Sequence, residues 1–209
     1  MRKGAQTRER LLDIAESAVL AKGFGSTSID ELIAAAGLTK SGFFYHFRDK
    51  NELARALLER YLEREDQIFD DIFARAAALT DDPLQSFLVA LKMLAELMEN
   101  LPEGHPGCIV ASYCYNERLF DRDVVELNRQ GVDNCRTRFR AMLADIANQY
   151  PPAQPVDLSE LADMVSTVLE GGIVVSRALG EPSVLSNQIL LFRTFVKILF
   201  DPTARAPHH

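Results

Sequence analysis

Apolar residues recur along most of the chain at the three- and four-residue spacing of an amphipathic α-helix. The first stripe contains Leu11, Leu12, Ala15 and Val19 and stops at Gly23. No segment shows the two-residue alternation of a half-buried strand, so we predict an all-α fold with about nine helices. The expected helices are 7–22, 29–36, 40–47, 51–78, 82–99, 121–149, 157–179 and 183–200, with a short apolar segment at 108–115.

Two short helices joined by a tight turn are predicted for residues 28–47. Ser28 and Glu31 have the spacing of a capping box, in which the serine oxygen accepts the Glu31 backbone N–H and the glutamate side chain reaches back. The first helix ends at Gly37, because glycine adopts the left-handed conformation that a sharp turn between helices needs. Thr39 is the expected N-cap of the second helix. This arrangement is typical of a helix-turn-helix motif.

The second helix of this motif is expected to have an apolar back and a polar front. Phe43 and Phe47 lie four residues apart, so both face the same side and are expected to be buried. The opposite side carries Lys40, Ser41, Phe44 and Tyr45. A short helix with small and hydrogen-bonding residues on its front fits the major groove of DNA. A helical hairpin with no role in DNA binding is the alternative interpretation.

The distribution of charge favours an interaction between the N-terminal part of the chain and DNA. The net charge of the 209 residues is −7, which by itself would argue against a nucleic-acid partner. Residues 1–60, however, hold 10 Lys and Arg against 8 Asp and Glu, whereas residues 61–209 carry a net charge of −9. Phosphate would repel the acidic part and leave the N-terminal part to approach the duplex.

A series of motifs follows in a fixed order through residues 7–60. They are the helix at 7–22, Gly23-Phe24, Thr27-Ser28, the run Ala36-Gly37-Leu38-Thr39-Lys40, the run Phe43-Phe44-Tyr45-His46-Phe47, Lys50 and Leu53. In the order and spacing of these motifs the segment resembles the DNA-binding domain of the tetracycline-repressor (TetR/AcrR) family of bacterial transcription regulators. The remaining three quarters of the chain resemble the family in the number and order of helices.

The resemblance implies a homodimeric regulator whose paired reading helices enter successive major grooves of a palindromic operator in double-stranded DNA. The residues that would face base edges are Lys40, Ser41 and Gly42, of which Lys40 suits guanine. The residues that would hold phosphates are Thr27, Ser28, Thr39, Tyr45, His46 and Lys50. Lys50 begins a helix, where a cation opposes the macrodipole, so a nearby phosphate would account for it.

The sequence departs from the family pattern at three positions. Phe44 stands where the family usually has tyrosine, so a hydroxyl that would contact phosphate is absent, and Tyr45 is the neighbour that would compensate. Phe44 is kept among the candidate DNA contacts. Ser41 replaces the usual glycine, and Ile33 replaces the usual alanine, which implies slightly different packing between the two motif helices.

By the same resemblance the chain divides into a helix-turn-helix DNA-binding domain at 1–50 and a helical effector-binding and dimerisation domain at 51–209. The family binds its effector among the middle helices, so we expect a repressor that a largely apolar small molecule releases from the operator. The candidate pocket residues are Phe69, Phe73, Met93, Leu97, Met98, Cys108, Tyr113, Phe120, Phe139, Met142 and Met164. Plain core packing is the alternative for each of them.

The last two helices are expected to form the dimer interface, because the family dimerises through a four-helix bundle built from these helices of each subunit. The candidate interface residues are Val165, Val168, Leu169, Ile173, Phe192, Phe195 and Leu199. Gly171 and Gly172 would allow two helices to approach closely. The alternative is that the same residues form a buried pair of helices within one chain.

Neither enzymatic activity nor a cofactor is expected. The chain lacks a Glu-x-x-His pair for a metal bundle, a glycine-rich phosphate loop and a plausibly placed Ser/His/Asp set. Cys108, Cys114 and Cys135 have no metal-ligand spacing, and His46 and His105 are too distant in sequence to indicate a metal centre. A helical carrier or enzyme is therefore the weaker alternative. An architectural DNA-binding protein without an effector is the other.

A cytoplasmic location without a membrane partner is expected. The sequence has no run of about 18 uncharged apolar residues, and a charged segment at 7–10 stands where a signal peptide would have its apolar core. Three cysteines cannot all pair with one another, which suits a reducing compartment.

Overall fold

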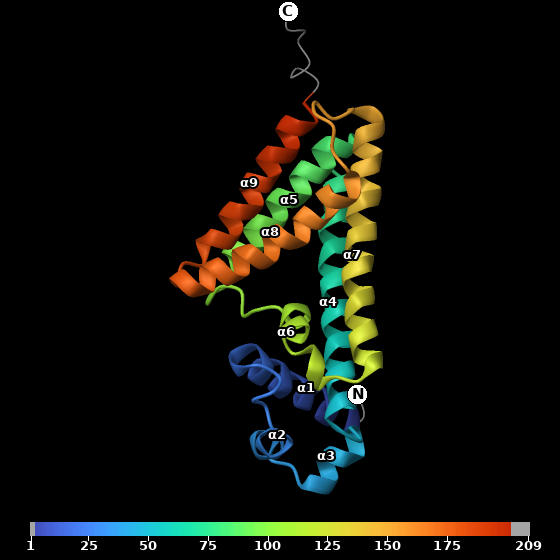
Figure 1. The fold of residues 1–209 in the computed structure, drawn as a ribbon. Helices are drawn as coiled ribbons and strands as arrows, with labels where there is room; N and C mark the ends of the chain where they lie inside the picture. The colour runs from blue at the N-terminus through green and yellow to red at the C-terminus, as the bar shows by residue number, and fades with distance from the viewer. Residues whose placement is uncertain (1–2, 202–209) are drawn as a thin grey trace, which may run out of the picture. The chain divides into compact units, whose positions relative to one another are not determined.

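The chain is all-helical over residues 3–201, the part that the computed structural model describes (Figure 1). The helices are α1 (Lys3–Lys22), α2 (Ile29–Ala36), α3 (Lys40–His46), α4 (Lys50–Ala77), α5 (Pro83–Glu99), α6 (Ile109–Tyr115), a short 3-10 helix η1 (Glu117–Leu119), α7 (Arg122–Gln149), α8 (Leu158–Leu179) and α9 (Ser183–Leu199). The predicted all-α fold with about nine helices is confirmed. Within these residues no helix is both long and apolar enough to cross a membrane.

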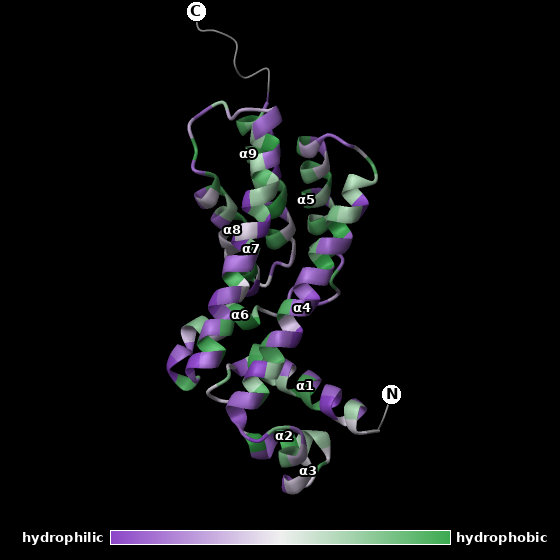
Figure 2. Ribbon diagram, turned by 90° about the vertical axis from the view of Figure 1, so that its right-hand side faces the viewer, coloured by the Kyte–Doolittle hydropathy of each residue, from purple (hydrophilic) through white to green (hydrophobic). Residues whose placement is uncertain are grey.

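The described residues pack into two compact units. Unit 1 holds residues 3–65 and 106–132, and unit 2 holds residues 66–105 and 133–201. The long helices α4 and α7 contribute residues to both units. Hydrophobic and hydrophilic residues alternate along the helices of each unit, as green and purple in Figure 2. Each unit therefore builds its own core from the apolar sides of its helices.

The core of unit 1 holds its short helices in place. Leu12 of α1, Leu32 of α2, Phe43 of α3 and Leu57 of α4 are all completely buried in one apolar cluster. Helices of eight and seven residues, such as α2 and α3, would be marginal in isolation. Burial against α1 and the first half of α4 therefore stabilises them and fixes where α3 lies within unit 1.

In unit 2, α5 and α8 both pack against α9, and the three helices lie side by side in Figure 1. Gly172 of α8 permits the close approach, because a Cβ atom at that position would lie 2.8 Å from Leu185 Cδ1 of α9. Arg193 of α9 donates from Nε to the Leu88 carbonyl of α5 at 2.8 Å. The apolar sides of α8 and α9 that face each other and α5 thus form part of the core of this unit, to which α4 and α7 add buried residues such as Ile72 and Leu143.

Side-chain caps fix the starts of the helices around the turn motif. Ser28 Oγ accepts the Glu31 N–H at 3.2 Å, and Asp49 Oδ1 accepts the Glu52 N–H at 2.8 Å. The predicted return contact of the first capping box is wrong. Both oxygens of the Glu31 carboxylate bind the Lys22 ammonium, at 2.5 and 2.6 Å, because an ion pair is stronger than a bond to a neutral backbone N–H.

Candidate nucleic-acid interface

The turn between α2 and α3 has the geometry that the sequence predicted. Gly37 adopts φ 61° and ψ 36°, in the left-handed region, and its N–H donates to the Ala34 carbonyl at 3.1 Å. Thr39 then begins α3, where its hydroxyl oxygen accepts the Gly42 N–H at 3.1 Å. Other residues are strained in this backbone conformation, so glycine allows the reversal that presents α3.

Helix α3 has one buried face and one exposed face. Phe43 and Phe47 are 0% and 1% exposed, and their ring centroids are 5.8 Å apart. On the other side Lys40 and Ser41 are exposed, and Tyr45 is 81% exposed. The predicted orientation of the helix is therefore confirmed. The exposed side chains can contact a partner without disturbing the core behind them.

The exposed face of α3 is edged by aromatic side chains. Phe44 is 40% exposed and makes an edge contact with Phe43, with ring centroids 5.4 Å apart. The Tyr45 and His46 rings lie nearly perpendicular, with centroids 5.0 Å apart, and His46 is half-buried. A tyrosine hydroxyl and an imidazole N–H are both donors that can bind a phosphate oxygen.

Ser28, Thr39 and Ser41 place hydroxyl groups at the starts of the two motif helices. Ser28 and Thr39 are exposed N-caps whose oxygens accept backbone N–H groups, so the capping contacts do not use their hydroxyl hydrogens. The Thr39 and Ser41 oxygens are 3.0 Å apart, so one hydroxyl donates to the other. Gly42 follows directly and is half-buried, and a Cβ there would lie 3.3 Å from Thr39 Oγ1.

Two of the predicted phosphate contacts are already bound within unit 1. Thr27 is 2% exposed, and its hydroxyl donates to the Gly23 carbonyl at 3.0 Å. The Lys50 ammonium donates to the Phe24 carbonyl at 2.8 Å and lies 4.3 Å from the centroid of the Phe24 ring. Burial lowers the pKa of Lys50. The phosphate contacts predicted for Thr27 and Lys50 therefore need correction, because both polar groups are bound within unit 1 and Phe24 accounts for the cation at the start of α4.

Most cations of unit 1 have partners inside the unit, and two beside α3 remain accessible. Arg10, for example, donates from Nη2 to the Ala36 carbonyl at 2.6 Å. Lys40 is exposed and has no ion pair among the residues that the structure describes. The Arg48 side chain is 83% exposed, although its Nε contacts Asp49 Oδ2 at 3.1 Å. Lys40 and Arg48 are thus the cations best placed to meet DNA together with α3.

Three of the predicted pocket residues belong to unit 1. Cys108 is the N-cap of α6 and accepts the Ala111 N–H at 3.4 Å. The Tyr113 hydroxyl donates to the Ala54 carbonyl at 2.9 Å, and its ring stacks on Phe120 with centroids 4.2 Å apart. Burial raises the pKa of Tyr113. These contacts give the three residues structural roles in unit 1. The other eight candidates belong to unit 2, so the eleven residues do not all belong to one unit.

The other eight pocket candidates lie in unit 2, where an aromatic cluster contains three of them. Phe139 is completely buried and makes edge contacts with Phe69 and Phe73, at centroid distances of 5.4 and 5.8 Å. Phe87 stacks on Phe73 at 6.0 Å and was not predicted. The remaining candidates, partly buried or exposed, are Met93, Leu97, Met98, Met142 and Met164. An aromatic cluster and adaptable methionines in one unit suit an apolar ligand.

The predicted dimer contacts need correction, because one apolar side of α8 and α9 is used within the chain. The buried residues are Val165, Ile173, Phe192 and Leu199, at 2–8% exposure, whereas Leu169 is half-buried. A second apolar side is accessible at three- and four-residue spacing. We call it the outer stripe, and it comprises Val168, Gly171 and Val175 of α8 with Leu191, Phe195 and Ile198 of α9. Of the predicted set, Val168 and Phe195 belong to it.

The residues that the sequence analysis missed carry weak signals. Arg48 lies in the short connection between α3 and α4, where exposure could have been expected from its position beside the motif. Phe87 shares a helical stripe with Leu84 and Leu91, all buried in α5, and nothing in that pattern separates it from ordinary core. The outer stripe is hidden in the sequence because α8 and α9 are apolar on two sides.

Known proteins with similar sequences are regulators of transcription. The family profile described as bacterial regulatory proteins, tetR family, matches residues 11–57. The chain is 33% identical over 171 residues to the HTH-type transcriptional regulator TtgR of Pseudomonas putida, with 79% of this chain and 78% of TtgR covered. It is 23% identical over 169 residues to the probable HTH-type transcriptional regulator ArpR, also of Pseudomonas putida, with 79% and 78% covered.

Solved structures with the same fold cover nearly the whole chain. A TetR-family transcriptional regulator from Agrobacterium tumefaciens matches with a TM-score of 0.77 at 16% identity, over 95% of this chain and all 100% of that one. A TetR transcriptional regulator from Chloroflexus aurantiacus matches with a TM-score of 0.75 at 24% identity, over 94% of this chain and 97% of that one. At these identities the likeness establishes the fold.

Proposed function

Because the chain belongs to the TetR family of bacterial transcriptional regulators, we propose that α3 is the helix that reads its DNA operator. The observation that carries the proposal is the division of α3 into a buried back and an exposed front that begins with Lys40. Lys40, Ser41 and Gly42 would face base edges in the major groove, with Lys40 donating to guanine O6 or N7. The small residues beside it let the helix backbone come close.

Phosphate contacts would come from side chains around this front. Ser28, Thr39, Tyr45 and His46 supply hydroxyl or ring donors, and Arg48 adds an accessible guanidinium. Phe44 would contribute apolar contact to sugar or base. Thr27 and Lys50 are left out, because their polar groups are bound to Gly23 and Phe24, and they position the backbone of the motif instead.

Two copies would bind one palindromic operator through a dimer formed by the outer stripe. An exposed apolar stripe on two neighbouring helices matches the four-helix bundle by which helix pairs associate. Its residues include Phe195 and Ile198, which are 42% and 63% exposed. No Cβ contact within 4 Å is found for Gly171, so a partner helix could approach closely there. The DNA-binding part would correspond to residues 1–50, and effector binding and dimerisation to 51–209.

Release from DNA would follow from an apolar effector bound in unit 2. The aromatic cluster of Phe69, Phe73, Phe87 and Phe139 supports this location. Helix α4 runs without interruption from Lys50 to Ala77 and contributes to both units, so a change at its far end would be carried to the reading unit. Effector binding would then weaken operator binding, and operator binding would weaken effector binding by the same factor.

The operator proposal is tested by selecting duplexes from a random-sequence library with the full chain. We expect inverted repeats with half-site centres about one helical turn, or a multiple of it, apart. Replacing Lys40 with Ala should relax preference at one position of each half-site, whereas Lys92→Ala should not, because Lys92 is an exposed cation of α5 paired with Glu96. Selection of no duplex, or of duplexes without symmetry, would contradict the proposal.

The effector proposal is tested with a panel of apolar compounds. A compound that raises the thermal midpoint should also weaken binding to the selected duplex, and Phe73→Trp should report its binding, since the chain has no other tryptophan. A compound that binds tightly in unit 2 and leaves operator affinity unchanged would argue for a DNA-binding protein without an effector response.

A further inference from the structure

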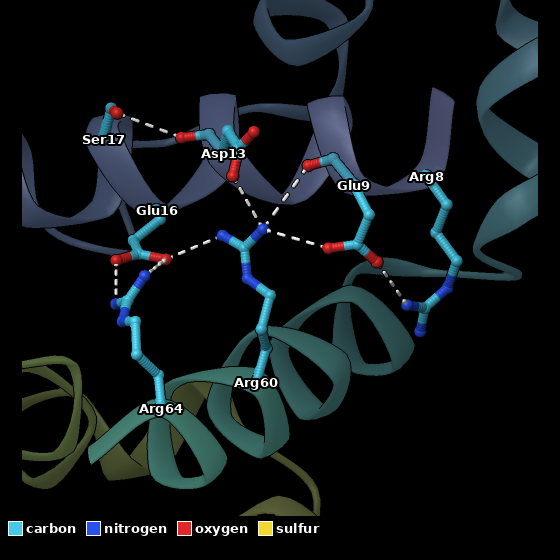
Figure 3. Close-up of polar contacts among 7 residues, drawn as sticks. All are labelled: Arg8, Glu9, Asp13, Glu16, Ser17, Arg60 and Arg64. Carbon is cyan, nitrogen blue, oxygen red and sulfur yellow. Dashed lines mark hydrogen bonds and ion pairs between the residues drawn. The ribbon is translucent and has the colours of Figure 1, made fainter. Parts of the chain in front are cut away.

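Helix α1 carries an acidic stripe that faces α4 and is not explained by DNA binding. Glu9, Asp13 and Glu16 are spaced by four and three residues, which places them on one face of the helix. Figure 3 shows Arg60 and Arg64 of α4 pointing toward this face. All five residues belong to unit 1. We call them the α1–α4 clamp.

Arg60 spans the stripe, and Arg64 holds one end of it. Arg60 Nη1 lies 2.7 Å from Asp13 Oδ1 and 3.4 Å from Glu9 Oε2, while Nη2 lies 2.7 Å from Glu16 Oε2. Nη1 also approaches the Glu9 carbonyl at 3.4 Å. Arg64 contacts both oxygens of Glu16, from Nη2 to Oε1 and from Nη1 to Oε2 at 3.4 Å. One guanidinium therefore fixes about two turns of α1.

The centre of the clamp is shielded from solvent. The Arg60 side chain is 19% exposed and that of Glu16 is 13% exposed, so salt screens this pair less than a surface pair. Arg60 Nε is buried and has no hydrogen-bond partner among the described residues. The guanidinium is thus oriented by its contacts to α1, even though one of its own donors is left unsatisfied. The contacts of Arg60 to α1 therefore fix how α1 lies on α4, although one N–H of the guanidinium has no partner.

Two cations of α1, Arg10 and Lys22, hold α2, the helix that precedes α3. Arg10 Nη2 donates to the carbonyl of Ala36, the last residue of α2, at 2.6 Å. Lys22 binds the Glu31 carboxylate in the first turn of α2. Gly37 then turns the chain directly into α3. Helix α1 therefore links the two neighbouring helices, because Glu9, Asp13 and Glu16 bind α4 while Arg10 and Lys22 bind α2.

We propose that Arg60 and Glu16 are positioning residues for operator recognition, because they set the angle of α1 on α4 and thereby where α3 is carried. The inference rests on the proposed function of α3. It adds that preference for the distance between half-sites depends on a contact that never touches DNA. Helix α4 continues past Arg64 into unit 2, so the clamp lies where that helix leaves unit 1, the unit that contains α3.

The test compares Arg60→Lys and Glu16→Gln with the control Arg55→Lys. Arg55 lies on α4 as well, but its partner Glu59 is on the same helix, at 2.9 Å, so it does not cross to α1. The probes are the duplex that the parent chain selects and versions with one base pair added or removed between half-sites. Lysine keeps the charge at position 60 but cannot hold Asp13 and Glu16 with one planar fork.

We expect Arg60→Lys and Glu16→Gln to remain folded by circular dichroism and to lose about tenfold in affinity for the preferred spacing. Their affinity for the altered spacings should fall less, so that the ratio between spacings shrinks. The double variant should lose less than the sum of the two single losses, because both changes weaken the shared contact between Arg60 and Glu16. Arg55→Lys should match the parent chain in both affinity and spacing ratio.

A lower thermal midpoint with an unchanged spacing ratio in both clamp variants would overturn the proposal, because the clamp would then act on stability alone. An equal shrinkage of the ratio in Arg55→Lys would overturn it too. If the parent chain selected no duplex at all, the proposed function would fail, and the positioning role would fail with it. Reduced spacing preference in the clamp variants alone would support the role.

Discussion

Lys40, the first residue of α3, and Lys50, the first residue of α4, differ in what their ammonium groups touch. Lys40 is exposed at the start of α3, whereas the Lys50 ammonium is held by the carbonyl and the ring of Phe24. Sequence position alone made both candidates for DNA contact. The distinction depends on Phe24 lying 26 residues before Lys50 in sequence but within hydrogen-bond distance in the fold. No local pattern encodes such a contact.

Replacing Lys50 with Met should therefore reduce stability and leave the salt dependence of DNA binding unchanged. Methionine keeps the apolar stem but loses the charged hydrogen bond and the cation–π contact, which together are worth about 1–2 kcal/mol. Urea unfolding measures the stability, and binding to the selected duplex over a salt series measures the slope. Arg48→Ala is the matched control, because Arg48 is a proposed phosphate contact. It should lower the slope of log affinity against log salt concentration by about one unit for each bound copy of the chain. A lowered slope for Lys50→Met would restore its role at phosphate.

Other residues of the candidate interface were predictable because their neighbours are close in sequence. Phe43 and Phe47 are buried since a helix places residues four apart on one side, and Gly37 is required by the reversal of the chain. For Arg48, helical spacing gives no prediction, and only its place in the connection beside the motif indicates exposure. Its exposure depends on how the connection between α3 and α4 leaves the core.

At the scale of elements, N-caps give some helices a dependence on pH. Asp82 caps α5 by accepting the Gln85 N–H at 2.8 Å, and its other oxygen accepts the Tyr150 hydroxyl. Partial burial raises the pKa of Asp82, but these hydrogen bonds outweigh it and leave the pKa below its ordinary value of 3.8. Because the folded pKa is lowered, the carboxylate contributes stability above the ordinary pKa and loses it as pH falls through the folded pKa.

Asp82→Asn should accordingly flatten the loss of stability in acid. Asparagine can still cap α5 but does not titrate, so the free energy of unfolding should fall less between about pH 5 and pH 2 than it does in the parent chain. Asp82→Ala should cost about 1 kcal/mol at pH 7, because the cap is lost. Urea unfolding at several pH values measures both effects. Parallel pH profiles for the parent chain and Asp82→Asn would contradict the assignment.

Gly171 and Gly172 are adjacent in α8 but lie in different surroundings. Gly172 packs against α9 of the same chain, whereas Gly171 belongs to the outer stripe. An added Cβ at Gly172 would lie 2.8 Å from Leu185 Cδ1 and 3.2 Å from the Leu185 backbone, whereas at Gly171 it would meet nothing within 4 Å. Gly172→Ala should therefore lose about 1 kcal/mol net, since overpacking exceeds the gain in helix propensity. Gly171→Ala should gain up to about 1 kcal/mol in a monomeric background such as Ile198→Glu. Equal effects of the two changes in urea unfolding would contradict the packing described.

Element boundaries were largely predictable, whereas the use of each helix face was not. Caps and breakers mark helix ends locally, and Ser28, Gly37 and Gly180 all stand where the sequence predicted. The choice of face on α8 and α9 failed because both helices carry apolar residues on two sides. Val165 and Ile173 are buried, while Val175 is 45% exposed. Helical periodicity places Ile173 and Val175 on opposite sides of α8 but does not tell which apolar side is buried within the chain.

For the whole molecule, the outer stripe should decide whether the chain is a dimer. Phe195→Glu would place a charge in an apolar interface without disturbing the core of unit 2, because the Phe195 side chain is 42% exposed. We expect a monomer by sedimentation and a loss of about 100-fold or more in affinity for the selected duplex. In a dimer the second α3 is held close to its half-site once the first has bound, and a monomer loses this advantage. Leu79→Glu is the control, at a residue 68% exposed outside the stripe. A dimeric Phe195→Glu would exclude the stripe as the interface.

The proposed separation of DNA binding from effector binding and dimerisation rests on the distribution of charge and on the two units. Residues 1–60 carry a net positive charge, and α3, the proposed reading helix, lies in unit 1. Sequence predicted that division but not its detail, because α6 and the start of α7 pack into unit 1 although they are far away in sequence. Contacts between distant segments, such as Tyr113 with Ala54, determine which helices belong together.

The central claim is that two copies of α3 bind one duplex together, and the most direct measurement changes the phase between half-sites. Inserting about 5 base pairs at the centre of the selected operator turns one half-site by half a helical turn and moves it to the opposite side of the duplex. Affinity is measured by fluorescence anisotropy at fixed salt. We predict a loss of about 100-fold, which a further insertion of about 5 base pairs partly restores. Equal affinity for the parent operator and the half-turn insertion would contradict the account.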